Sequence, residues 1–261
     1  MIINHDTAET IKTRVELVEE KIEAACRRSG RKRKDIRLMG VTKMHPLEKV
    51  EASWDAGIRL FGESRVQEGS EKFTKFWENH PRANTNGVGD TNGVGDTNKV
   101  GYANSVGELH LIGTLQRNKA NKAAAFFDCI QSVDRDSLIS ALGALTRGRE
   151  NPIKIMLEYH TGEETKAGFA DLDSLFRAAD MVMSFPGLLP CGLMTMAPYT
   201  TDWSVIRLSF KKLAAAKDEL EKRFPGNKEC WSCLSMGMTN DYEIAIEEGS
   251  TLIRIGTAIF G

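Results

Sequence analysis

The sequence predicts an α/β protein: a single (β/α)8 barrel, or TIM barrel, preceded by one extra N-terminal helix. Three observations carry this prediction. Short apolar segments alternate with longer segments of helical periodicity, which is the pattern of a parallel sheet. Eight such units fit within 261 residues, the size of a (β/α)8 barrel. No linker-like segment divides the chain, so we expect one domain over residues 1–261.

Each expected strand is a short run of apolar and β-branched residues that a turn signal ends. The first run ends at Met44-His45-Pro46, and the last ends at Gly256. In chain order, the strands are expected at residues 36–43, 59–63, 108–113, 129–133, 153–159, 189–195, 230–236 and 251–255.

The expected helices carry apolar residues at intervals of three and four, with charged residues between them. Ser29-Gly30 ends the extra helix, and Pro225-Gly226 ends the longest one. Asp134 is expected to be the N-cap after the fourth strand, and no helix is expected after the last strand. In chain order, the helices are expected at residues 7–28, 47–56, 65–77, 116–127, 134–145, 172–183, 203–223 and 241–248.

An open, doubly wound parallel sheet is the alternative that shares this alternation. Such sheets commonly bind dinucleotides through Gly-x-Gly-x-x-Gly directly after a strand. No expected strand is followed by that motif, so we favour the closed barrel.

A hexapeptide repeat interrupts the pattern between the second and third strands. Thr-Asn-Gly-Val-Gly-Asp occurs twice in tandem, at 85–90 and 91–96. Gly and Asn at this density favour turns, and we expect a low-complexity surface loop at 84–104. Glycine-rich calcium repeats exist, but this one offers only two carboxylates, Asp90 and Asp96. We therefore expect no metal site.

Composition excludes several classes of function. The net charge is -1, from 35 basic and 36 acidic residues, which gives no bulk attraction to nucleic acid or anionic membranes. No apolar run reaches the roughly 18 residues of a membrane span, and the N-terminus lacks a signal peptide's basic and apolar regions. Five cysteines, mostly in apolar runs, suit a reduced interior. We expect a cytoplasmic protein without nucleic-acid or membrane partners.

Cys230-Trp-Ser-Cys233 has the spacing of a redox or metal site. There is no second such pair and no nearby histidine. Residues three apart on a strand point in different directions, so we interpret the pair as structural.

Residues at the carboxyl ends of the strands carry the candidate chemistry, because the active sites of (β/α)8 barrels lie there. The first strand ends on Lys43. Its ammonium must reach solvent, pair or react, since burying it alone is costly. Taken alone, the segment favours a lysine with its amine in solvent. The alternative is a Schiff base with an aldehyde cofactor.

The turns after the seventh and eighth strands match the usual place of a phosphate site. Ser235, Gly237, Gly256 and Thr257 combine small residues, which let backbone N–H groups approach a phosphate, with two hydroxyl donors. Gly and Ser are common in turns, so either turn alone is weak evidence. The two together, with Lys43 on the first strand, point to a phosphorylated aldehyde.

Two further residues in apolar strands admit two interpretations each. Arg254 does not deprotonate and needs an acceptor, either an acid at the barrel mouth or the ring nitrogen of a pyridine aldehyde. Facing that nitrogen, it would keep the ring unprotonated and weaken it as an electron sink. His110 could stack on a ring or fill the core.

Motifs along nearly the whole chain resemble the pyridoxal phosphate homeostasis protein family. They are Val41-Thr-Lys43, Phe61-Gly-Glu63, Val66-Gln-Glu68, His110-Leu-Ile-Gly113, Leu115-Gln-x-Asn-Lys119, Gly192-Leu-Met194, Leu234-Ser-Met-Gly-Met238 and Arg254-Ile-Gly-Thr-Ala-Ile-Phe-Gly261. The resemblance implies a barrel like the N-terminal domain of alanine racemase, with pyridoxal 5'-phosphate (PLP) covalently on Lys43.

The same resemblance implies roles for the remaining candidates. Ser235, Gly237, Gly256 and Thr257 would hold the phosphate, and Arg254 would face the ring nitrogen. Where the family reads Phe-Gly-Glu-Asn-Tyr, this chain has Phe61-Gly-Glu-Ser64-Arg65, which changes the contact that the asparagine would make. The cofactor-binding set that we expect is Lys43, Ser64, His110, Met196, Ser235, Gly237, Arg254, Gly256 and Thr257.

The function implied is PLP homeostasis. A monomer would hold PLP, or deliver it to apo forms of PLP enzymes, and so influence amino and keto acid pools without catalytic turnover or catalytic residues. The alternative is a PLP-dependent amino acid racemase. Racemisation needs acid–base groups on both faces of the ring. Lys43 serves one face, and no residues remain for the second domain that supplies the other in racemases of this fold. A barrel that binds another phosphorylated metabolite is the third possibility, if Lys43 is unmodified.

Overall fold

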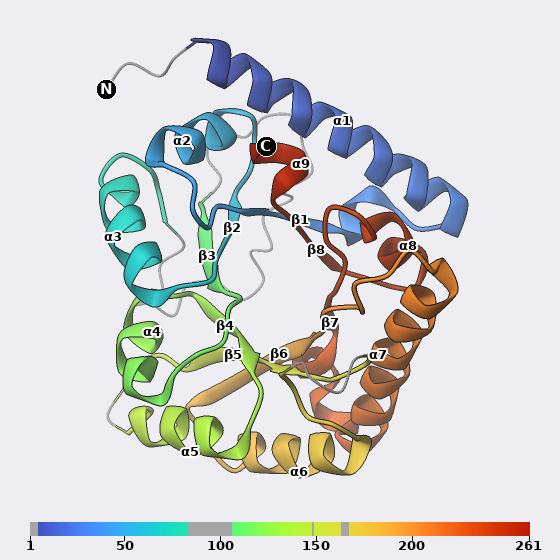
Figure 1. The fold of residues 1–261 in the computed structure, drawn as a ribbon. Coiled ribbons are helices and arrows are strands. Elements are labelled where there is room, and N and C mark those ends of the chain that lie inside the picture. Colours follow the sequence, from blue (N-terminus) through green and yellow to red (C-terminus); the bar gives the residue numbers. More distant parts are fainter. Residues whose placement is uncertain (1–4, 83–105, 148, 163–166) are drawn as a thin grey trace.

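The computed structural model describes residues 5–82, 106–147, 149–162 and 167–261. Eight parallel strands form a closed barrel in sequential order, and the eighth strand pairs with the first. Helices surround the barrel on the outside (Figure 1). The predicted fold class is thus confirmed. The loop expected at 84–104 lies outside the described residues.

The strands agree closely with the predicted segments. Their bounds are β1 (Arg37–Val41), β2 (Leu60–Glu63), β3 (Glu108–Leu111), β4 (Cys129–Val133), β5 (Ile153–Glu158), β6 (Leu188–Met194), β7 (Cys233–Ser235) and β8 (Leu252–Ile255).

The helices follow the same order, with short 3-10 segments between some of them. The helices are α1 (His5–Ser29), α2 (Leu47–Asp55), α3 (Val66–Trp77), α4 (Ala120–Phe126), α5 (Asp136–Leu145), α6 (Leu172–Met183), α7 (Trp203–Arg223), α8 (Tyr242–Glu247) and α9 (Thr257–Phe260). The 3-10 segments are η1 (Arg33–Asp35), η3 (Arg117–Lys119) and η4 (Pro225–Trp231).

Three local predictions were wrong. The strand expected at 230–236 is halved, because η4 occupies its start and Trp231 is fully buried there against Phe224. Asp134 is not an N-cap: α5 begins two residues later, and Arg135 is its N-cap. The last strand is followed by a helix after all. The four residues of α9 are too few to show helical periodicity in the sequence.

The extra helix α1 lies along the outside of the barrel, beside α2, α8 and α9 (Figure 1). Its apolar stripe, which includes Ile11, Val15 and Ile22, is buried in the main core between helices and sheet. At its C-terminal end, Arg28 forms ion pairs with Glu243 and Glu247 of α8. This helix therefore joins the two ends of the helical ring.

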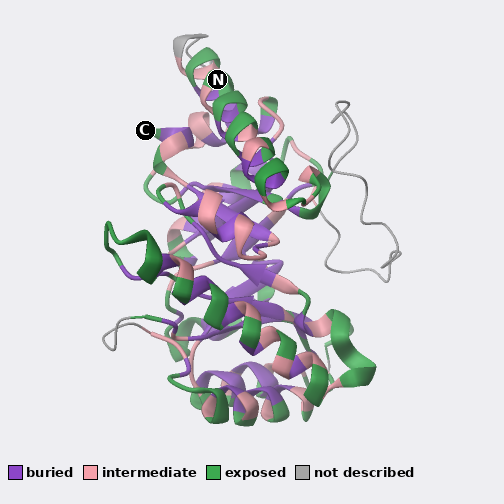
Figure 2. Ribbon diagram, turned by 90° about the vertical axis from the view of Figure 1, so that its right-hand side faces the viewer, coloured by how far each residue is buried: buried purple, intermediate pink, exposed green. Residues whose placement is uncertain are grey.

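The barrel interior holds a smaller apolar cluster, and the strands around it are almost entirely buried (Figure 2). Its buried members are Met39, Leu60, Cys129, Met156, Met194 and Leu252, and the partly buried Ile112, Cys191 and Cys233 pack against them. Since side chains alternate along a strand, residues two positions from such members also face inward. The polar ones among these inward-facing residues are Arg37, His110, Gln131, Glu158, Ser235 and Arg254.

Candidate active site at the barrel mouth

Lys43 lies in the turn that follows β1, at the carboxyl end of the barrel, and its side chain is exposed. Thr42 before it is completely buried. Met44 after it adopts a left-handed backbone conformation with φ of 62°, the only positive φ of a non-glycine residue among those described. Such a conformation costs roughly 1–2 kcal/mol. The turn that presents Lys43 is therefore strained.

Arg254 of β8 lies at the same end of the barrel and is buried. Its Nη1 donates to the carbonyl oxygen and to Oγ of Ser235, both at 2.7 Å, and its Nη2 donates to the carbonyl of Thr195 at 2.8 Å. Three of its five N–H groups are thus engaged by described residues. Burial lowers the pKa of Arg254 to about 10, although Asp241 and Glu158 oppose this. Its guanidinium is therefore charged at neutral pH.

Ser235 contacts this arginine with both its carbonyl and its hydroxyl oxygen. Its side chain is fully buried. Its Oγ accepts from Arg254 and donates to Oε1 of Gln131 at 2.6 Å. The hydroxyl therefore acts as both acceptor and donor toward residues inside the protein.

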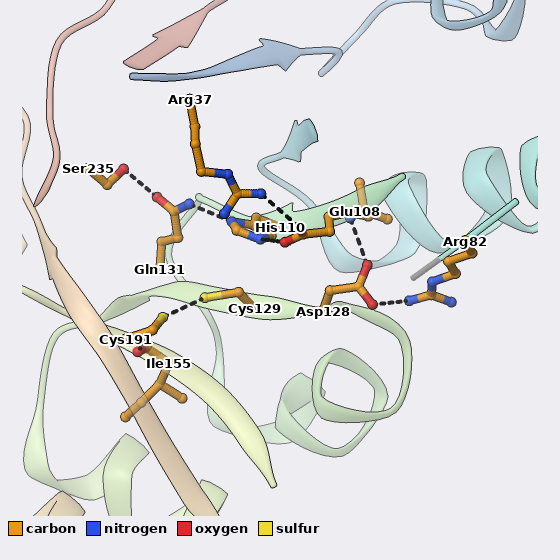
Figure 3. Close-up of polar contacts among 11 residues, drawn as sticks. Arg37, Arg82, Glu108, His110, Asp128, Cys129, Gln131, Ile155, Cys191 and Ser235 are labelled. Carbon is orange, nitrogen blue, oxygen red and sulfur yellow. Dashed lines mark hydrogen bonds and ion pairs between the residues drawn. The ribbon is translucent and has the colours of Figure 1, made fainter. Parts of the chain in front are cut away.

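A chain of polar contacts continues from Gln131 through the buried His110 to the partly exposed Glu108 and Arg37 at the other end of the barrel (Figure 3). The Nε2 of Gln131 lies 2.7 Å from Nδ1 of His110, and Nε2 of His110 lies 3.2 Å from Glu108. Arg37 of β1 donates to the second oxygen of Glu108 at 2.8 Å. Burial raises the pKa of Glu108, but the charge of Arg37 and the contact with His110 outweigh it and lower that pKa overall.

His110 thus belongs to this interior chain. It pairs with Gly62 in the sheet, and Gly62 pairs with Val41, so His110 lies level with a residue two positions before Lys43. The structure does not bring its side chain beside the exposed amine.

The other expected residues lie at strand ends around the mouth. Ser64 follows β2 and is half-buried, Met196 follows β6 and is 36% exposed, and Thr257 is exposed at the start of α9. Gly256 precedes it directly as the N-cap of α9. Gly237 has a φ of 94°, and a Cβ there would lie 2.6 Å from Cβ of Ala245. The turn after β7 therefore requires glycine at this position.

Sequence reasoning missed two residues of this region, Gln131 and Glu158. Glu158 ends β5 and is 3% exposed. Burial, reinforced by Asp134, raises its pKa to about 7 despite the charge of Arg254. The available signal was a charged residue ending an apolar strand, the same signal that identified Lys43.

The described part of the chain shows neither a membrane-spanning helix nor a metal cluster. None of its helices is both long and apolar enough to cross a bilayer. No three of its His, Cys, Asp or Glu side chains gather as metal ligands.

Comparison with known proteins agrees with this geometry. Residues 17–261 match the family model described as alanine racemase, N-terminal domain. A protein of Vibrio cholerae serotype O1 named pyridoxal phosphate homeostasis protein is 32% identical over 253 residues, which cover 97% of this chain and 96% of that protein.

Solved structures give the same result. A protein from Bifidobacterium adolescentis superposes with a TM-score of 0.87 at 31% identity, covering 99% of this chain and 98% of that chain. PipY of Synechococcus elongatus PCC7942, solved with PLP bound, has a TM-score of 0.75 at 27% identity, covering 96% of this chain and all of that chain (100%). The chain belongs to the alanine racemase N-terminal domain family and, within it, to the pyridoxal phosphate homeostasis proteins.

Proposed function

We propose that this protein binds PLP at the carboxyl end of its barrel, through a Schiff base with Lys43, and serves PLP homeostasis by holding or delivering the cofactor. Arg254 carries the proposal. Among the described residues, acceptors engage three of the five N–H groups of this buried guanidinium, which lies at the same strand ends as an exposed amine. This arrangement suits a ligand with an acceptor nitrogen and a carbonyl. PLP has both of these groups and also a phosphate.

The donor set of the mouth fits the cofactor. Lys43 would bind its aldehyde, and Arg254 would donate to its ring nitrogen. Gly237, Gly256 and the exposed hydroxyl of Thr257 would hold the phosphate. Ser64 and Met196, which follow β2 and β6 at the same end of the barrel, would complete the proposed contacts. His110 and Ser235 would act on the cofactor only through Arg254, since their polar atoms are engaged in the interior chain.

The same residues favour a carrier over an enzyme. A donor such as Arg254 facing the ring nitrogen leaves that nitrogen unprotonated, which weakens the ring as an electron sink. The family relationship with alanine racemase keeps a PLP-dependent amino acid racemase as the alternative function. Exchange of the α-proton of alanine or serine in deuterated water, at enzymatic rates, would establish that alternative.

The decisive experiment is reconstitution with PLP, followed by borohydride reduction and peptide mass mapping. We expect a visible Schiff-base band and the reduced cofactor on Lys43. K43A should lose both, whereas K75R on α3 should keep both. An unmodified Lys43 in the wild-type protein would contradict the proposal and favour a barrel that binds another phosphorylated metabolite.

We also propose that the protein is monomeric and cytoplasmic, and that apo forms of PLP enzymes receive the cofactor. Mixing the loaded protein with an apo enzyme should restore that enzyme's activity faster than the same concentration of free PLP does. Equal rates would show that the protein only stores the cofactor. Sedimentation velocity at micromolar concentration checks the oligomeric state.

A further inference from the structure

The turn that carries Lys43 is tied to helix α3 on both sides of the lysine. Before it, the carbonyl of Thr42 accepts a hydrogen bond from Nζ of Lys72 at 2.8 Å. After it, the backbone N–H of Met44 donates to Oε1 of Glu68 at 2.7 Å. Glu68 and Lys72 lie one helical turn apart on α3, so a single helix face holds both neighbours of Lys43.

These two contacts belong to one connected cluster. Besides Thr42, Nζ of Lys72 contacts Oε1 of Glu63 at 2.9 Å and Oε1 of Glu68 at 3.5 Å. These three contacts match the three donors of an ammonium group. Glu63 also accepts from the hydroxyl of Thr42 at 2.7 Å. The side chain of Glu63 is fully buried, and that of Lys72 is 10% exposed. Thr42 is therefore fixed through both its carbonyl and its hydroxyl.

Met44 shows why the turn needs this support. Its backbone is left-handed, with φ of 62°, a conformation that a side chain disfavours. Its own side chain is 79% exposed, so packing does not impose this conformation. Within the turn, the N–H of His45 donates to the carbonyl of Thr42 at 3.1 Å. The hydrogen bond from the N–H of Met44 to Glu68 then anchors the turn on α3.

We propose that Glu68 and Lys72 are positioning residues for Lys43, holding its turn in the strained form that presents the amine at the barrel mouth. This inference rests on the proposed PLP site. It also accounts for Phe61-Gly-Glu63 and Val66-Gln-Glu68, two motifs to which the cofactor contacts give no role.

Matched control variants for Glu68 and Lys72 come from the same groove, which has a volume of about 930 Å³. It lies between α2, α3 and η3, and both Glu68 and Lys72 line it. Glu71 and Lys75 of α3 line the same groove. Glu71 bonds to Gln67 of its own helix. E71A and K75M therefore remove the same kinds of charge from the same helix without removing a contact with the turn.

The first experiment measures the rate at which the Schiff-base band appears when PLP is added. E68A should react about tenfold more slowly than wild type, the effect of one lost charge-assisted hydrogen bond. E68Q should recover most of the rate, because its amide oxygen can still accept from Met44. K72M should also be slow, while E71A and K75M should match wild type. Equal rates for E68A and E71A would overturn the proposal.

A second measurement does not need the cofactor. Amide hydrogen exchange at Met44 should be faster in E68A than in wild type and restored in E68Q, with the circular dichroism spectrum unchanged. Unchanged exchange in E68A would contradict the proposed positioning role of Glu68. A wild-type protein that forms no adduct on Lys43 would refute the proposed PLP site. The exchange measurement would still decide whether Glu68 holds the turn at Met44.

Discussion

Nη1 of Arg254 lies 2.7 Å from Oγ of Ser235, and this contact fixes the direction of every hydrogen bond behind it. An arginine side chain only donates, so the serine hydroxyl must give its proton elsewhere. It gives it to Oε1 of Gln131 at 2.6 Å. The amide nitrogen of Gln131 then faces Nδ1 of His110 and donates to it. Nδ1 of His110 therefore accepts, and its Nε2 faces Glu108 at 3.2 Å.

Replacing Ser235 tests whether its hydroxyl holds Arg254 and Gln131 in place or binds the phosphate directly. In S235A, Oε1 of Gln131 loses its donor and Nη1 of Arg254 loses one of its acceptors. Leaving such buried groups unsatisfied should lower the free energy of unfolding by about 1–3 kcal/mol. PLP affinity should fall only through looser holding of Arg254.

T257A is the matched comparison, because the hydroxyl of Thr257 is exposed. It should leave stability within about 0.5 kcal/mol of wild type and weaken PLP binding more than S235A does. Denaturant unfolding and PLP titration of both variants measure these effects. A stable S235A protein with a large loss of affinity would instead support direct phosphate contact by Ser235.

The sequence was sufficient to predict the barrel, because strand and helix periodicities are local and alternate eight times. It also gave Lys43 and Arg254 as candidates, since a charged residue at the end of an apolar strand is visible without knowing its neighbours. Gln131 gave no such signal. Its importance comes from Ser235, which lies 104 residues later in the chain and three places along in the barrel's strand order.

The direction of the Ser235 hydroxyl could not be predicted either, because it depends on residues that are distant in the sequence. Ser235 ends β7 at the expected phosphate position, but where its Oγ points depends on partners from β4 and β8. The hold of α3 on Thr42 and Met44 likewise depends on how one helix packs against one turn. Such contacts arise only when the barrel closes.

Glycine at position 237 should be essential for the turn after β7. In G237A, the new Cβ would lie 2.6 Å from Cβ of Ala245, and the backbone would keep a φ of 94°. Overpacking and the left-handed backbone together should cost about 2–4 kcal/mol of unfolding free energy. G226A is the control, because nothing lies within 4 Å of a Cβ at that position. Thermal unfolding of both variants measures the difference, and equal midpoints would contradict the strain assigned to Gly237.

Glu158 should make stability fall as pH rises through the weakly acidic range. Its pKa in the folded protein is raised to about 7 from an unfolded value of 4.5. Between these values the folded protein binds the proton and the unfolded chain does not, so the free energy of unfolding decreases as pH increases. The full difference amounts to about 3 kcal/mol. The contribution is complete below pH 4.5 and lost above pH 7.

E158Q isolates this contribution from those of Glu63 and Asp128, whose pKa values burial also raises. Glutamine cannot ionise, so E158Q should be as stable as wild type near pH 4 and more stable by up to about 3 kcal/mol at pH 8. Urea unfolding of both proteins at several pH values gives the difference directly. If the two stability curves stay parallel from pH 5 to pH 8, then Glu158 has an ordinary pKa, and the charge of Arg254 compensates fully for its burial.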